Sequence, residues 1–319
     1  MTTVRPAVLA GAWYPGRPDR LRDEVDGYLA GADPGRLPPG APAVALVPHA
    51  GYPYSGPTAG KLYGLLRDLP LDAVFILAPS HRAALQRPAL SGADAFATPL
   101  GDVPVATAIV RRLLESGHYV VDDRAHAAEH AVEIQLPFVQ RTWPGIPVVP
   151  VLVPPLAPAV RHAAARALDP WRDGRHLLLV SSDLTHYGHT YGYVPFTDDV
   201  PARLENLDTG ALLRFMARDA DGLLQYREET GITMCGLDAA ALALDGETGD
   251  HHAELLDYAR SGDREQDFAM SVSYAAALLT RGDDGAAGLT GDERRLLLAL
   301  ARRSVAAAAA DGPSPAPED

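Results

Sequence analysis

Four of the eleven histidines stand beside predicted strand ends or in the loops that follow them: His49, His81, His130 and His186. Two apolar runs, 43–47 and 73–77, lead into His49 and His81, so parallel strands would bring both rings to one sheet edge. That edge is where open α/β sheets bind ligands. Two imidazoles together with a thiolate or carboxylate can supply three ligands to one metal ion and leave coordination positions open for water, O₂ or substrate. The alternative is that these are ordinary polar loop residues.

The single cysteine, Cys235, could supply the thiolate. It begins an Ala/Leu-rich stretch, 235–244, that is predicted to be a helix, and the dipole at a helix N-terminus lowers the pKa of a thiol. Gly236 beside it permits a close approach of backbone. A lone cysteine in an apolar helix is more commonly a small buried hydrophobic residue, and the spacing alone leaves both interpretations open.

The segment 181–186, Ser-Ser-Asp-Leu-Thr-His, offers a carboxylate and an imidazole directly after a predicted strand. In one interpretation Asp183 orients His186, which acts as an acid/base group. In another, Ser181 or Ser182 is the nucleophile of a hydrolase. The Gly-x-Ser-x-Gly elbow that hydrolases commonly use is absent, which favours the first interpretation.

Glu129, His130 and Glu133 add titratable groups around the predicted helix 131–142. Their charges could equally form a solvated helix face. Five further histidines stand in helical or turn contexts and are expected at the surface: His118, His162, His176, His251 and His252.

Strands alternate with helices up to about residue 280, which predicts a three-layer α/β/α domain. Helices are predicted over residues 18–29, 58–69, 103–116, 131–142, 159–168, 204–216, 219–227 and 235–244. Strands are predicted over residues 43–47, 73–77, 148–153, 176–180, 254–259 and 270–279. The last two strands lack a long helix between them, so the central sheet is expected to be mixed. Residues 1–281 are therefore predicted to form one domain.

Residues 282–319 have a different pattern, which predicts a flexible linker, one amphipathic helix and a disordered tail. The helix is expected to begin at a capping box, Thr290-Gly-Asp-Glu293. The final residues, 314–319, are rich in proline and acidic.

The composition excludes several classes of protein. The net charge of −13, with no local basic cluster, disfavours nucleic-acid binding. No run of about 18 apolar residues suggests a membrane span, and the first residues do not resemble a signal peptide. One cysteine forms no intrachain disulfide, which fits a reducing compartment. The protein is expected in the cytoplasm.

Seven ordered motifs span roughly Arg5 to Thr280: Gly11-Ala-Trp-Tyr-Pro15, Pro48-His-Ala-Gly-Tyr-Pro-Tyr54, Ile76-Leu-Ala-Pro-Ser-His81, Glu129-His-Ala-Val-Glu-Ile-Gln-Leu-Pro137, Ser181-Ser-Asp-Leu-Thr-His186, Met234-Cys-Gly236 and Ser271-Val-Ser-Tyr-Ala-Ala276. In this order they resemble the Memo family, also called AmmeMemoRadiSam system protein B. The resemblance implies a fold like that of LigB-type extradiol dioxygenases, which are non-haem iron(II) enzymes.

By this resemblance the metal ligands correspond to His49, His81 and Cys235. LigB-type enzymes use a carboxylate as the third ligand, so a cysteine would make the site softer and more tolerant of copper or zinc. The substrate-side acid/base residue corresponds to His186, with Asp183 near it.

The remaining site residues follow from the same resemblance. His130 is expected behind the ligands or in the pocket wall, with a role in catalysis. Trp13, Tyr52 and Tyr54 resemble the aromatic pocket lining of Memo proteins. Two positions depart from the family pattern, because relatives commonly carry histidine where this chain has Arg82 and Gln135.

Two functions follow from the resemblance. The first is a metal-dependent oxygenase or related redox enzyme that uses iron(II), with copper or zinc as alternatives. The second is a non-catalytic accessory protein that binds a metal, a small molecule or a peptide in the same pocket. A hydrolase that uses Ser181 or Cys235 as nucleophile ranks third.

The tail suggests partners. Leu289-Thr-Gly-Asp-Glu-Arg-Arg-Leu-Leu-Leu-Ala-Leu-Ala-Arg-Arg303 resembles the opening helix of AmmeMemoRadiSam system protein A, which is sometimes fused behind protein B. Protein A and a radical-SAM protein are therefore expected partners.

Overall fold

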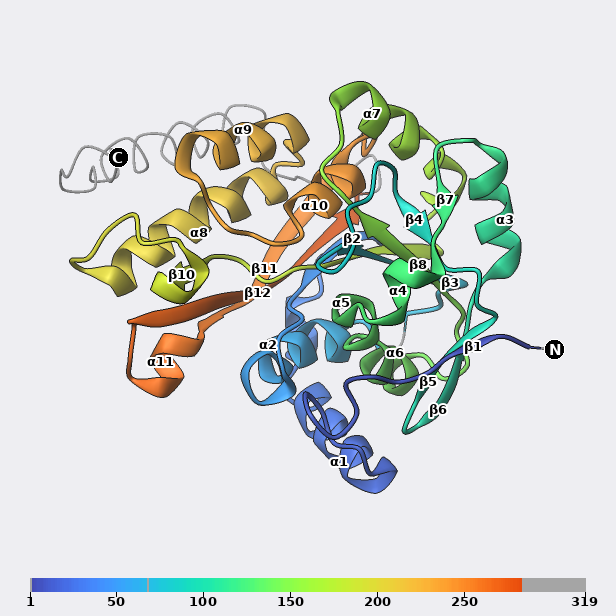
Figure 1. The fold of residues 1–319 in the computed structure, drawn as a ribbon, viewed down its shortest axis with the longest axis horizontal. Coiled ribbons are helices and arrows are strands. Elements are labelled where there is room, and N and C mark those ends of the chain that lie inside the picture. Colours follow the sequence, from blue (N-terminus) through green and yellow to red (C-terminus); the bar gives the residue numbers. More distant parts are fainter. Residues whose placement is uncertain (1, 68, 283–319) are drawn as a thin grey trace.

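The computed structural model describes residues 2–67 and 69–282, whose centre is a nine-stranded mixed sheet with helices on both faces (Figure 1). The strand order is β10-β12-β2-β9-β3-β8-β4-β7, and β11 pairs with β12. This arrangement confirms the predicted three-layer α/β/α fold with a mixed sheet. The predicted linker, helix and tail of residues 282–319 lie outside the described residues, apart from Gly282.

Four parallel strands form the middle of the sheet: β2 (Ala41–Val47), β9 (His176–Ser181), β3 (Ala73–Pro79) and β8 (Val148–Val153). Almost all of their residues are buried, as expected for short aliphatic runs covered on both faces. The other strands are β12 (Met270–Arg281), β11 (His251–Arg260), β10 (His186–Gly188), β4 (Ala89–Leu90) and β7 (Val120–Val121). Since β2, β9 and β3 are parallel neighbours, their carboxyl ends meet at one edge, as predicted from the two strand-end histidines.

The helices form two groups on opposite sides of the sheet (Figure 1). One group consists of α1 (Pro18–Leu29), α2 (Tyr52–Leu65), α5 (His130–Glu133) and α6 (Leu136–Thr142). The other consists of α7 (Pro158–Arg166), α8 (Val200–Met216), α9 (Ala220–Thr230) and α10 (Leu237–Leu244). Shorter or peripheral elements are α3 (Thr107–Glu115), α4 (Asp123–Ala127), α11 (Ser261–Glu265), and the 3₁₀ turns η1 (Pro34–Arg36), η2 (Asp169–Trp171) and η3 (His189–Tyr191).

A small second sheet was not predicted. It contains β1 (Val4–Arg5), β5 (Ala95–Thr98) and β6 (Gly101–Pro104). The predicted helix 103–116 is therefore wrong at its start, because Val103 pairs with Phe96 in the β5–β6 hairpin and α3 begins only at Thr107.

Helix α2 begins six residues before the predicted start, at Tyr52. Pro53 is tolerated in its first turn, where the backbone N–H groups have no helical partner. Pro57 lies inside the helix and cannot donate to the carbonyl of Pro53. The Arg264 guanidinium donates to that carbonyl instead, so the acceptor left free by Pro57 is satisfied.

No helix within residues 2–67 and 69–282 is both long and apolar enough to cross a membrane.

Candidate metal centre

Three histidines meet at the carboxyl edge of the parallel strands. One ligand nitrogen from each of His49, His81 and His130 lies within 4.8 Å of the others. The rings of His81 and His130 stack with centroids 4.4 Å apart, and the ring of His49 stands at 90° to both, at 5.3 and 5.2 Å. His49 follows β2, His81 follows β3, and His130 begins α5, so three different elements fix the cluster.

Glu129 orients two of these rings. Its Oε1 lies 2.9 Å from His81 Nδ1 and 3.2 Å from His130 Nδ1, and its Oε2 accepts from the His81 backbone N–H at 2.7 Å. Burial opposes ionisation of this carboxyl, but the contacts with His81 and with backbone N–H groups lower its pKa to about 2. An ionised carboxylate only accepts, so the His81 Nδ1 carries the hydrogen and Nε2 is left as the donor nitrogen.

His49 is buried and lies next to β9. Its Nδ1 is 3.1 Å from Ser181 Oγ, and its backbone N–H donates to Asp183 Oδ1 at 2.8 Å. Burial, with the neighbouring His81 and His186, lowers the pKa of His49 to about 3. Burial, with His49 and His81, likewise lowers the pKa of His130 to about 3. Both rings are therefore neutral, which is the form that binds metals.

Cys235 also reaches the cluster. Its Sγ lies 3.1 Å from His49 Nε2 and accepts from the Asp183 backbone N–H at 3.3 Å. The expectation that Cys235 begins a helix and has a lowered pKa is wrong. The helix α10 starts at Leu237, and burial and the nearby Asp183 raise the pKa of the thiol.

The donor set fits a metal ion of borderline softness, because imidazole and thiolate are the ligands that iron, copper and zinc accept. Cys235 Sγ and His49 Nε2 lie 3.1 Å apart, so both atoms could contact one ion. Within the 4.8 Å limit, however, His130 and not Cys235 completes a set of three with His49 and His81.

Asp183 and His186, the predicted acid/base pair, both lie beside the cluster, but backbone carbonyls and not Asp183 orient the His186 ring. His186 directs Nδ1 toward the carbonyl oxygens of Leu184 and Thr233, at 3.1 and 3.2 Å. Because carbonyls only accept, Nδ1 carries the hydrogen of the neutral ring, and the lone pair on Nε2 is left to accept a proton. Asp183 is buried, which raises the pKa of its carboxyl, and its Oδ2 lies 4.0 Å from His49 Nε2.

The three predicted pocket aromatics have different positions. The ring of Trp13 is 36% exposed and lies 4.7 Å from that of His130. Tyr54 is 40% exposed and donates to Glu265. Tyr52 is instead a core residue, 1% exposed, whose hydroxyl donates to the carbonyl of Ile134, so it does not line an open pocket.

Several features around the site differ from the expectations drawn from the sequence. Glu129 and Glu133 are buried and do not form the solvated face that was considered. The position of Glu129 directly before α5 was a usable signal, because its side chain accepts from two N–H groups of that helix as an N-cap. Tyr191, whose ring lies 5.2 Å from that of His186, is in a 3₁₀ turn and had no periodic signal.

One histidine expected at the surface is buried. His251 is 6% exposed and its Nε2 lies 3.0 Å from Glu247 Oε2, far along the chain from the cluster. His162, which was expected at the surface, lies on α7 with a side chain 43% exposed.

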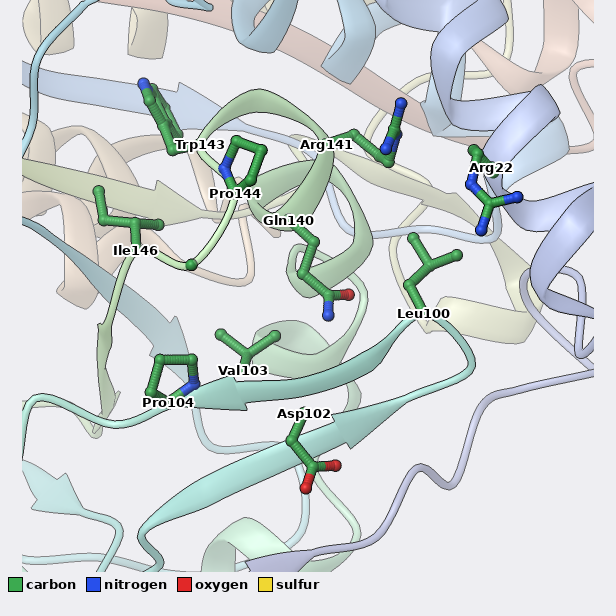
Figure 2. A pocket seen from close by; sticks show the side chains of 11 residues that line it. Arg22, Leu100, Asp102, Val103, Pro104, Gln140, Arg141, Trp143, Pro144 and Ile146 are labelled. Atoms are coloured by element: carbon green, nitrogen blue, oxygen red, sulfur yellow. The ribbon is translucent and has the colours of Figure 1, made fainter.

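A cavity of about 280 Å³ lies away from the predicted site residues, beside the amino end of β8 (Figure 2). Leu100, Val103 and Ile146 form apolar walls, and Arg22 and Arg141 lie at one end. Asp26 pairs with Arg141 at 2.8 Å, which neutralises one of these two cations. None of the histidines of the cluster lines this cavity.

The fold and the cluster define an α/β protein with three histidines that could hold a metal ion. Comparison with known families identifies the group. The profile of the Memo-like protein family matches residues 5–278, and the chain belongs to this family.

Named relatives agree with this assignment. A MEMO1 family protein of Methanopyrus kandleri is 32% identical over 298 residues, covering 87% of this chain and 99% of that protein. A memo-1 homolog of Caenorhabditis elegans is 29% identical over 291 residues, covering 86% of this chain and 82% of that protein.

Among solved structures, an uncharacterized protein of Escherichia coli K12 matches with a TM-score of 0.49 and 14% identity, over 75% of this chain and 99% of that one.

Proposed function

We propose that this chain is an iron(II)-binding metalloprotein with oxygenase or related redox activity, with copper and zinc as alternative metals. The proposal rests on the three histidines whose ligand nitrogens lie within 4.8 Å of one another. In two of these histidines, His81 and His130, the Nδ1 atom also contacts the Glu129 carboxylate. Neutral imidazoles held from behind by a carboxylate are typical of metal sites.

His49 and His81 are proposed as ligands in two alternative arrangements, which differ only in the third ligand. Cys235 is the proposed third ligand, supported by the 3.1 Å separation between its Sγ and His49 Nε2. His130 is the competing third ligand, supported by its place in the compact nitrogen cluster. X-ray absorption at the metal edge separates the two, because only the Cys235 arrangement gives a sulfur neighbour at about 2.3 Å.

Bound iron(II) would supply an open coordination position for O₂ and for a chelating substrate. The residues of the chain have separate roles around that position. His186, with its hydrogen fixed on Nδ1, holds or accepts a proton at Nε2. Trp13 is partly exposed and its ring centroid lies 4.7 Å from that of His130, so it would limit access of water to that ring.

The test is O₂ consumption by protein loaded anaerobically with iron(II), screened with catechols and related phenols. The parent is expected to consume O₂ with at least one substrate. The His186→Ala variant is expected to retain iron and to lose activity about 10²–10⁴-fold, as for loss of a general acid or base. Equal activity of parent and His186→Ala would refute the proposed role of His186.

The second candidate is a non-catalytic protein that binds a metal and a small molecule or peptide. Three exposed aromatic residues favour it, since such rings suit a ligand platform: Trp13, Tyr54 and Tyr191. Full iron loading without O₂ consumption for any phenol would favour this candidate. The hydrolase is less well supported, because Ser181 is fully buried and burial raises the pKa of the Cys235 thiol.

Protein A and a radical-SAM protein stay proposed partners, and a cytoplasmic location stays a prediction. The segment 289–303 that suggested protein A lies outside the described residues.

A further inference from the structure

The hydroxyl of Ser181, at the carboxyl end of β9, contacts three groups. Its Oγ lies 3.1 Å from His49 Nδ1, 2.7 Å from the carbonyl oxygen of Ala131 and 2.9 Å from Gln135 Nε2. Ser181, Gln135 and His49 are all buried, with exposed fractions of 0%, 1% and 1%. Protein groups therefore decide where each of their hydrogens points.

The orientation of the Gln135 amide follows from its other neighbours. Its Nε2 lies 2.9 Å from the carbonyl oxygen of Pro48, and its Oε1 accepts from the Tyr63 hydroxyl at 3.0 Å. A carbonyl oxygen only accepts, so the amide nitrogen and not the amide oxygen must face Pro48. The same nitrogen donates its second hydrogen to Ser181 Oγ. Toward Gln135, Ser181 is thus an acceptor.

The remaining two contacts fix the hydrogen of Ser181 and then that of His49. A hydroxyl has one hydrogen and two lone pairs. One lone pair accepts from Gln135, and the hydrogen goes to the Ala131 carbonyl, which can only accept. The second lone pair faces His49 Nδ1, so Nδ1 must carry the hydrogen of the neutral ring. The lone pair of His49 is then on Nε2, the atom that lies 3.1 Å from Cys235 Sγ.

We propose that Ser181 is a positioning residue, which fixes the His49 ring in the tautomer with the hydrogen on Nδ1 and so presents Nε2 as a metal donor. The other tautomer would have to turn the Ser181 hydroxyl away from the buried Ala131 carbonyl and leave that acceptor unpaired, which is unfavourable. His49 is thus held by a neutral hydroxyl, whereas His81 and His130 face the Glu129 carboxylate. The metal-binding role of this tautomer rests on the proposed function. The tautomer itself follows from contacts within the protein and can be measured without metal.

Long-range ¹H–¹⁵N NMR of the metal-free, full-length protein reports which ring nitrogen carries the hydrogen. The His49 signals are those that disappear in His49→Ala. We expect the Nδ1–H form in the parent. Ser181→Ala removes the hydroxyl acceptor but keeps the Ser181 backbone carbonyl near the ring, and it is expected to increase the population of the Nε2–H form. Ser181→Thr keeps the hydroxyl and is expected to restore the parent spectrum.

Ser182→Ala is the matched control for the tautomer, because Ser182 is equally buried but its hydroxyl contacts the Asp183 carbonyl, the Gly236 N–H and, at 3.7 Å, Cys235 Sγ instead of the His49 ring. Its His49 tautomer is expected to be unchanged. In a zinc titration, Ser181→Ala is expected to bind about 10–100-fold more weakly than the parent.

A hydrogen on Nε2 of His49 in the parent would overturn the proposal, as would an unchanged tautomer in Ser181→Ala. If Ser181→Ala does not fold, the parent spectrum and Ser181→Thr still decide the question. The Nδ1–H tautomer in a parent that binds no metal would support the role of Ser181 and refute the proposed function.

Discussion

At the residue scale, one carboxylate serves two rings of the cluster. Glu129 Oε1 faces Nδ1 of both His81 and His130, and both Glu129 oxygens also accept backbone N–H groups. A buried carboxylate in this position sets the ring orientations and adds negative charge behind the ligands. The affinity of the cluster for a metal should therefore depend on a residue that does not touch the ion.

Glu129→Gln tests this dependence. We expect metal affinity to fall about 10–100-fold, because the amide carries no negative charge behind the rings, and its NH₂ group replaces one oxygen that accepts an N–H group in the parent. Isothermal titration with zinc or iron(II) measures the change. Glu133→Gln is the matched control on the same short helix, since Glu133 faces Arg5, Tyr14 and the backbone N–H of Leu9.

The control should lose stability, on the order of 3–5 kcal/mol for a broken buried ion pair, and keep its metal affinity. Metal affinity of Glu129→Gln equal to that of the parent would show that the carboxylate does not support the cluster.

At the element scale, α1 and α2 approach so closely that glycine is required at the contact. A Cβ added at Gly60 would lie 2.5 Å from the backbone carbonyl of Tyr28, and one at Gly64 would lie 2.2 Å from that of Leu29. Since α2 begins only three residues after His49, this packing also helps to hold the loop that carries His49.

Gly60→Ala should lower the free energy of unfolding by about 1–3 kcal/mol, because the added methyl meets backbone that cannot move easily. Gly27→Ala, in α1, is the control. A Cβ there meets nothing within 4 Å, and the variant should gain up to about 1 kcal/mol from helix propensity. Urea unfolding measures both. A Gly60→Ala protein as stable as the parent would contradict the close contact.

A buried ion network joins other elements away from the cluster. Glu247 pairs with Arg172 before β9, with Arg281 at the end of β12, and with His251 at the start of β11. Burial opposes ionisation of Glu247, but His251 and the two arginines lower its pKa from 4.5 to about 2. A carboxyl whose pKa is lowered in the folded protein contributes its full stabilisation at pH values above its pKa in the unfolded chain. This contribution is lost as the pH falls toward 2.

Glu247→Gln should therefore cost on the order of 3–5 kcal/mol at neutral pH, where the parent carboxylate is ionised and paired. Its free energy of unfolding should fall less steeply than that of the parent between pH 4.5 and about 2. Chemical denaturation at several pH values tests this. Parallel pH profiles for the two proteins would exclude Glu247 as a source of acid sensitivity.

Long periodic elements of this fold were predictable from sequence, and short ones were not. Helix α1 and strand β8 have the predicted bounds, because a clear helical period and an uninterrupted aliphatic run define them. The start of α2 was missed because Pro53 and Pro57 normally indicate a loop, and only the distant Arg264 compensates for Pro57. Strands of two to four residues, such as β1 and β6, have no periodicity to detect.

At the scale of the whole molecule, parallel strand order is what turns two distant histidines into neighbours. The sequence predicted that His49 and His81 share a sheet edge, and the neighbouring parallel strands β2, β9 and β3 confirm it. His130 was expected behind the ligands or in the pocket wall. Its place among the clustered ligand nitrogens was not predicted, because that depends on how α5 packs against β3. For Glu129, the N-cap position before α5 indicated contacts with the helix N–H groups but not burial, since a charged residue at a helix start is normally solvated.

The central claim is that His49 and His81 hold a metal ion, and bound metal is its most direct measurement. Protein reconstituted anaerobically with iron(II) should contain about one iron per chain by elemental analysis. His49→Ala and His81→Ala should each lose most of it, whereas the control His162→Ala, on α7 with a side chain 43% exposed, should keep it. Iron contents of both site variants equal to that of the parent would contradict the account and leave the cluster without a metal.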